Sequence, residues 1–122
     1  MNADQITEQI LGSAFEVSNV LGSGFSEKVY ERALLEELRS RGLNVREQAC
    51  LRLHYKGKIV GNYFLDLLVE NEVVVELKCV ENLAPEHMAQ CLNYLRAANL
   101  KVALLLNFQR SKLGWQRIVN NF

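Results

Sequence analysis

The chain has 122 residues, of which 49% are apolar, and its 14 basic and 14 acidic residues give a formal net charge of zero. This length predicts a single domain over residues 1–122 with enough apolar content for a core, and the sequence shows no signal peptide and no membrane-spanning run. A neutral chain does not favour tight nonspecific binding to nucleic acid.

Two helices are predicted first. Apolar residues recur at helical spacing over residues 3–21, and Gly22-Ser23-Gly24 ends that pattern. A second helix is expected from Ser26, which can cap it, to Arg41, with Gly42 as its stop. Its inner stripe is formed by Tyr30, Leu34 and Leu38.

Strands dominate the rest of the chain. Residues 45–55 alternate apolar and polar, which predicts a half-buried strand with one face formed by Ala49, Leu51, Leu53 and Tyr55. Turns at 56–58 and 70–72 then bound two further strands, 63–69 and 73–79. Pro85 is expected to open a third helix, whose buried stripe is Met88, Cys91, Leu92 and Leu95. The apolar run 101–106 predicts a central strand, and residues 115–119 a possible last one. The fold class is therefore a small α/β domain with a mixed sheet and the order ααβββαβ.

Three charged residues lie inside the two apolar runs of the predicted hairpin: Asp66, Glu76 and Lys78. If the hairpin is symmetric about Asn71, residue 66 lies opposite residue 76, and all three side chains share one face. Two carboxylates placed opposite each other repel. A divalent cation is the best reason for such an arrangement, although a salt-bridged pair on a solvated sheet face is the simpler alternative.

Carboxylates suit Mg²⁺ or Mn²⁺, which prefer oxygen ligands and retain several waters. A lysine beside them is able to hold the attacking water and to offset charge that develops on a phosphate. This combination predicts metal-assisted hydrolysis of a phosphodiester bond.

Three residues elsewhere are candidates for the same site. Glu27 shares the inner stripe of the second helix, either as an inward-pointing carboxylate of the site or as a residue that stabilises the helix dipole. Gln90 and Tyr94 flank the apolar stripe of the third helix, where they either reach toward the carboxylates or lie at the edge of the core.

These residues form recognisable motifs. Gly24 to Tyr30 fits GxxExxY, Gln90 to Tyr94 fits QxxxY, and Asp66 with Glu76-Leu77-Lys78 lies between them. In this order the pieces resemble the GxxExxY protein family of the PD-(D/E)XK nuclease superfamily, over nearly the whole chain. The superfamily core is αβββαβ, which matches the elements predicted from Ser26 to residue 106. Leu65 replaces the proline of the superfamily's name, at a position that supplies no ligand.

The resemblance implies a role for each residue. Asp66 and Glu76 would bind the metal ion, with the carbonyl group of Leu77 as a third ligand. Lys78 would orient the nucleophilic water, and Glu27 would assist metal binding directly or through water. Gln90 and Tyr94 would position the site and the nucleic-acid backbone, as in RecB-like and lambda-exonuclease-like members. We further expect a cytoplasmic, prokaryotic protein that acts on nucleic acid, DNA rather than RNA.

Other polar and sulfur-containing residues are weaker candidates. The segment after Asn107 either contacts phosphates and bases or forms a solvated basic edge strand, through Arg110, Lys112, Trp115 and Arg117.

His54 and His87 have no partner at nucleophile or zinc spacing and are interpreted as structural or solvated. Cys50, Cys79 and Cys91 have no CxxC spacing and are predicted to be reduced core thiols of a cytosolic protein.

The leading hypothesis is thus a small Mg²⁺- or Mn²⁺-dependent nuclease, without a membrane partner. The alternative is a catalytically inactive binding or assembly module with the nuclease fold. Dimerisation is one way for so small a chain to gain surface for substrate selection. An α/β domain with a chance motif is the third possibility.

Overall fold

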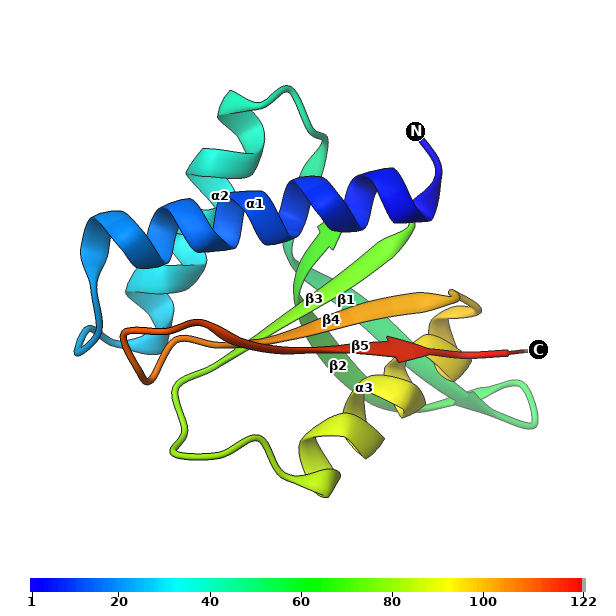
Figure 1. Ribbon diagram of the computed structural model, residues 1–122. Coiled ribbons are helices and arrows are strands. Elements are labelled where there is room, and N and C mark those ends of the chain that lie inside the picture. The colour runs from blue at the N-terminus through cyan, green and yellow to red at the C-terminus, as the bar shows by residue number, and fades with distance from the viewer. Residues whose placement is uncertain (122) are drawn as a thin grey trace.

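The computed structural model describes residues 1–121, so Phe122, which the predicted domain includes, lies outside the described residues. Three helices and five strands follow in the predicted order (Figure 1). Their bounds are α1 Ala3–Leu21, α2 Glu27–Ser40, β1 Val45–Tyr55, β2 Lys58–Val69, β3 Val73–Lys78, α3 Pro85–Ala98, β4 Val102–Asn107 and β5 Gly114–Val119. Within residues 1–121, no helix is both long and apolar enough to cross a membrane.

The five strands form one mixed sheet in the order β1-β2-β3-β4-β5. Only β3 and β4 are parallel, and α3 connects them as a crossover. The other neighbouring strands are antiparallel. The residues of β4 are all buried, as the unbroken apolar run predicted, because helices cover both faces of this strand.

Two apolar clusters hold the layers together. One packs α1 and α2 against the sheet through residues such as Ile10, Leu34 and Leu104. The other packs α3 against the opposite face through Cys91, Leu95 and other residues. Figure 1 shows this three-layer arrangement, with α1 and α2 on one side of the sheet and α3 on the other. The fold is the predicted α/β class.

The β1–β2 hairpin is longer than the sheet that supports it. These strands have 11 and 12 residues, whereas β3, β4 and β5 have six each. The excess forms a two-stranded projection, residues 50–64, which we call the arm. The prediction of a half-buried β1 is therefore right for Ala49 but wrong for Leu53 and Tyr55, which are 37% and 62% exposed. A shift of register between Leu53 and His54 further breaks the alternation.

Details of the helix ends and sulfur atoms differ from expectation. Ser26 is the N-cap of α2, but its side chain makes no capping hydrogen bond. Pro85 opens α3 as predicted. Of the three cysteines only Cys91 is buried, so the expectation of core thiols is wrong for Cys50, which is exposed because it lies on the arm.

Candidate active site

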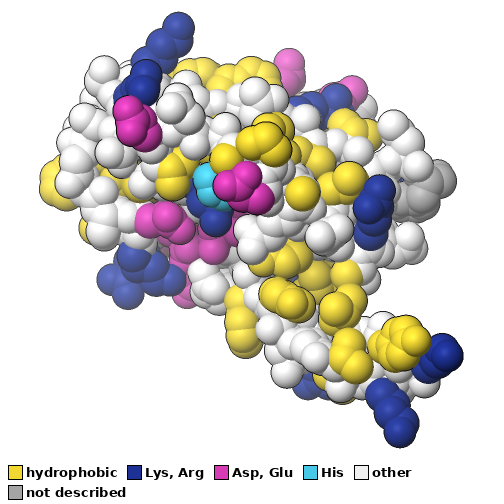
Figure 2. All heavy atoms as spheres, turned by 90° about the horizontal axis from the view of Figure 1, so that it is seen from below, with side chains coloured by type: hydrophobic (Ala, Val, Ile, Leu, Met, Phe, Trp, Pro, Cys, Tyr) yellow, Lys and Arg dark blue, Asp and Glu magenta, His cyan; other side chains and the backbone are white. Residues whose placement is uncertain are grey.

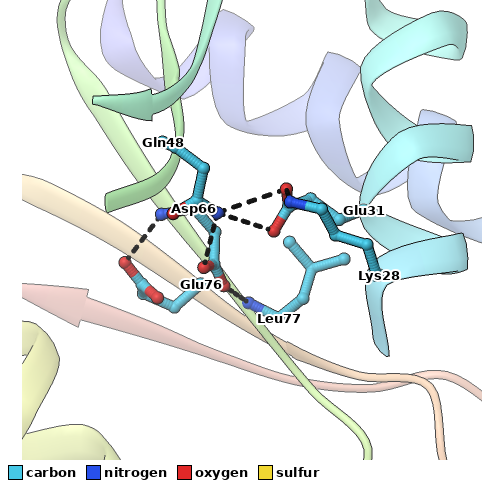
Figure 3. Close-up of polar contacts among 6 residues, drawn as sticks. All are labelled: Lys28, Glu31, Gln48, Asp66, Glu76 and Leu77. Carbon is cyan, nitrogen blue, oxygen red and sulfur yellow. Dashed lines mark hydrogen bonds and ion pairs between the residues drawn. The ribbon is translucent and has the colours of Figure 1, made fainter. Parts of the chain in front are cut away.

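The β2–β3 hairpin brings Asp66 and Glu76 together in the expected register. Leu67 pairs with Val75, and Val69 with Val73, and the backbone ladder then ends. Beyond it, the N–H of Asp66 donates to Glu76 Oε1 (3.2 Å) and the N–H of Leu77 donates to Asp66 Oδ2 (2.8 Å). The two carboxylates thus replace ladder hydrogen bonds where the strands separate, which fixes them next to each other (Figure 3).

The regular alternation of side chains along β2 is interrupted at Asp66. Leu65 packs in the cluster under α3, whereas Leu67 packs in the cluster under α1 and α2. A regular strand would place residues two apart on the same face. In β1, the residue at this level is Gln48, between the pairs Glu47–Leu67 and Ala49–Leu65, and its φ is +48°. Both strands therefore twist at this point, which turns the arm away from the sheet.

A polar network centred on the buried Glu31 supports Asp66 from α2. The carboxylate of Glu31 is 4% exposed and accepts hydrogen bonds from Gln48 Nε2 (3.1 and 3.2 Å) and from Lys28 Nζ (2.8 Å). The same Gln48 nitrogen lies 3.5 Å from Asp66 Oδ1 (Figure 3). Glu31 and Gln48 were not identified from the sequence as part of the site. Glu31 is flanked by the apolar stripe of α2, and glutamine carries no local signal for a left-handed conformation.

This network is expected to stabilise the fold. Glu31→Ala should lower the free energy of unfolding by about 1–3 kcal/mol, because the hydrogen bonds that Lys28 and Gln48 donate to the buried Glu31 carboxylate are lost. Glu36→Ala, at an exposed position of the same helix, should change it by less than about 0.5 kcal/mol. Urea unfolding of the two variants and the wild type measures the difference. Equal losses in both variants would contradict a supporting role for Glu31.

The GxxExxY motif builds the loop that carries Glu27. Gly24 has φ +108°, which residues with a side chain rarely adopt. The Tyr30 hydroxyl donates to the carbonyl of Gly22 and accepts from the N–H of Phe25, and the buried ring stacks on Phe108. The loop is thus held against α2, with Glu27 in the first turn.

Glu27 is exposed in the first turn of α2, so it is not part of the buried inner stripe of this helix. It nevertheless faces the site. Partial desolvation and the charge of Asp66 raise the pKa of Glu27, while Lys78 and the Cys79 backbone oppose the rise.

Glu76 is the most perturbed carboxyl group of the site. It is 4% exposed, and burial, followed by the charge of Asp66, raises its pKa from 4.5 to about 9. The Lys78 ammonium opposes this rise. Two carboxylates that resist ionising together are suited to a divalent cation, which would remove the cause of the rise. The oxygen donors present therefore fit Mg²⁺ or Mn²⁺.

The ligand set is small. Among residues 1–121, no group of three or more His, Cys, Asp or Glu side chains is placed to hold a metal ion. A cation here would take Asp66 and Glu76, complete its shell with carbonyl oxygens and water, and leave Glu27 to act through water. One or two carboxylates with several waters is the usual protein share for Mg²⁺.

Helix α3 brings a thiol and a phenol to the site. Burial and then the charge of Glu76 raise the pKa of Cys91 to about 12 and also raise the pKa of Tyr94. Both groups are therefore neutral near Glu76. Gln90, one turn before Tyr94, is exposed and lines a groove together with it.

The other candidates lie apart from the carboxylates. Arg117 pairs with Asp4 of α1 (2.8 Å). Arg110, Lys112 and Trp115 line a separate pocket at the β4–β5 end of the sheet. His87 Nδ1 accepts the N–H of Ala84 at the start of α3, and His54 is exposed on the arm, in agreement with their interpretation as structural or solvated residues.

Comparison with known proteins gives the family. The family model described as the PD-(D/E)XK nuclease superfamily matches residues 4–118, so the chain belongs to this superfamily. Its nucleases generally use divalent metal ions and act on nucleic acid. No curated protein matches this chain significantly.

Solved structures share the fold at low identity. SSO0001 is 16% identical with a TM-score of 0.58, over 98% of this chain and 59% of that protein, so the chain spans less than two thirds of its length. LHK-Exo, an alkaline exonuclease from Laribacter hongkongensis, is 13% identical in its complex with dAMP (TM-score 0.54, 94% of this chain and 83% of that one). A second LHK-Exo structure is 15% identical, with a TM-score of 0.51 over 98% and 83%.

Proposed function

We propose that this chain is a single-domain, metal-dependent nuclease of the GxxExxY family that hydrolyses phosphodiester bonds, in DNA rather than RNA. The observation that carries the proposal is the contact between Asp66 and Glu76 beside Lys78, in a member of a nuclease superfamily. The dAMP bound by the structurally similar exonuclease supports DNA as the substrate.

The proposed roles follow from position and charge. Asp66 and Glu76 would hold Mg²⁺ or Mn²⁺ together with the Leu77 carbonyl group, and Glu27 would assist through water. The cation, when bound, lowers the pKa of its water and neutralises phosphate charge. Lys78 would orient the nucleophilic water by hydrogen bonding and offset the negative charge that grows on the phosphate oxygens. Tyr94, a neutral hydroxyl near Glu76, would donate to a phosphate oxygen, with Gln90 beside it positioning the backbone.

Cleavage and metal binding test this function together. Labelled DNA and RNA of one sequence, incubated with Mn²⁺ or with EDTA, should be cut only with Mn²⁺, and DNA faster than RNA. Calorimetry should detect Mn²⁺ binding to the wild type and none to Asp66→Asn, because the amide keeps the side-chain size but loses the anionic ligand. Mn²⁺ binding without cleavage would favour an inactive module with the nuclease fold. Equal binding by Asp66→Asn would remove Asp66 from the metal site.

A further inference from the structure

A groove lies between α3 and the inner face of the arm. It has a volume of about 680 Å³, within the range of sites that hold organic ligands. Apolar and amide side chains form most of it, with Arg96 and Glu86 as its charged residues. The residues used below are Leu51, Leu53, Tyr63, Gln90, Asn93 and Tyr94.

The groove approaches the candidate active site at Tyr94. Tyr94 connects the two, since it lines the groove and the charge of Glu76 raises the pKa of its hydroxyl. A polymer bound at the carboxylates through one phosphate would reach the groove by passing Tyr94.

Two tyrosine rings give this path a stacking surface. Tyr63 of β2 is 46% exposed, and its ring centroid lies 5.8 Å from that of Tyr94, with the ring planes tilted by 50°. Leu51 and Leu53 extend the apolar surface along β1. Unpaired bases stack on aromatic rings of this kind, whatever their sequence, whereas the bases of a duplex present only their edges.

The arm carries positive charge only, although the whole chain has a formal net charge of zero. Residues 50–64 include Arg52, Lys56 and Lys58 and no aspartate or glutamate. Figure 2 shows the arm projecting from the body, with apolar side chains along it and basic side chains at its end. Positive charge beside exposed aromatic rings is the combination with which proteins bind single strands without reading their sequence.

We propose that this groove binds a single-stranded segment of the nucleic-acid substrate, with its bases against Tyr63 and Tyr94. Lys56, Lys58 and Arg96 contact its phosphates, Gln90 positions its backbone, and Asn93 hydrogen-bonds the polar edges of its bases. The proposal rests on the proposed nuclease function and adds the class of substrate, an unpaired strand. The outer face of the arm exposes Val60 and Phe64, and a second copy of the chain is the competing occupant of the arm.

Binding without cleavage tests the groove. Fluorescence anisotropy of a labelled oligothymidine, its RNA equivalent and a duplex of equal length is measured in EDTA. The wild type should bind both single strands more tightly than the duplex. Tyr63→Ala should weaken single-strand binding roughly tenfold or more, and Tyr63→Phe should retain it because the ring remains. Circular dichroism confirms that the variants are folded.

Phe64→Ala is the matched control, since residues 63 and 64 are neighbours in one strand with similar exposure (46% and 55%). It should change single-strand affinity by less than about twofold. Three results would contradict single-strand binding in the groove. They are tight binding of the duplex, equal losses of affinity in Tyr63→Ala and Phe64→Ala, and a loss in Phe64→Ala alone that sedimentation shows to accompany dissociation of a dimer. A Tyr63-dependent affinity in a protein that never cuts with Mn²⁺ would support the groove and contradict the nuclease function instead.

Discussion

Replacing Lys78 by alanine is expected to reduce Mn²⁺-dependent cleavage at least about a hundredfold, the loss typical when a preorganised donor to developing charge is removed. The side chain is partly exposed, and its positive charge opposes the rise in the pKa of both Glu27 and Glu76. Because an ammonium cannot ligate a cation, Mn²⁺ binding should persist in this variant. The loss should appear in kcat under saturating substrate.

Three measurements separate this role from a structural one. Cleavage, Mn²⁺ calorimetry and thermal melting are recorded for Lys78→Ala and for Lys78→Met, which keeps an apolar stem without the charge. Both variants should melt near the wild type, bind Mn²⁺ and fail to cut. Cleavage at the wild-type rate in either variant would exclude Lys78 from the chemistry, and a fall in melting temperature with loss of Mn²⁺ binding would assign it to the fold.

The positions of the two candidate carboxylates could be predicted because they depend on residues that are close together in the sequence. The apolar runs around Asp66 and Glu76 define two strands, and the short turn between them fixes which residues face each other. The pairs Leu67–Val75 and Val69–Val73 confirm this register. A charged residue inside an apolar strand is conspicuous, so the sequence alone was sufficient to identify the carboxylates as candidates.

The arm could not be predicted, because its exposure depends on other strands. Alternation in residues 45–55 indicates a strand with one apolar face, and it carries no information about how far neighbouring elements extend. β3 and β4 end after six residues, and α3 leaves a groove beside the arm. Leu53 and Tyr55 therefore remain exposed.

The support of Asp66 was equally invisible in the sequence. Glu31 and Gln48 are 17 positions apart and meet only because β1 twists at a residue with positive φ. A glutamine in the sequence does not indicate a positive φ, whereas a glycine such as Gly24 does. Local patterns thus identify the candidate carboxylates of this site better than the residues that support them.

The stability of the metal-free protein is expected to fall as pH rises from about 5 to 9. The pKa of Glu76 is about 9 in the folded protein and 4.5 for a glutamate in the unfolded chain, so between these values the folded state binds a proton that the unfolded state has released. Stability decreases wherever the folded state binds more protons, by at most about 1.4 kcal/mol per pH unit for one group. The raised pKa of Glu27 acts in the same direction.

Glu76→Gln isolates this contribution, since the amide is neutral at every pH in the window. Urea unfolding in EDTA should show a smaller decline for this variant than for the wild type. Mn²⁺ should stabilise the wild type more at pH 8.5 than at pH 5.5, because the cation competes with the proton for the carboxylates, and it should not stabilise Glu76→Gln. A metal-free stability that is flat or rises over this range would mean that Asp66 and Glu76 ionise together without cost. The electrostatic reason for placing a cation between them would then be lost.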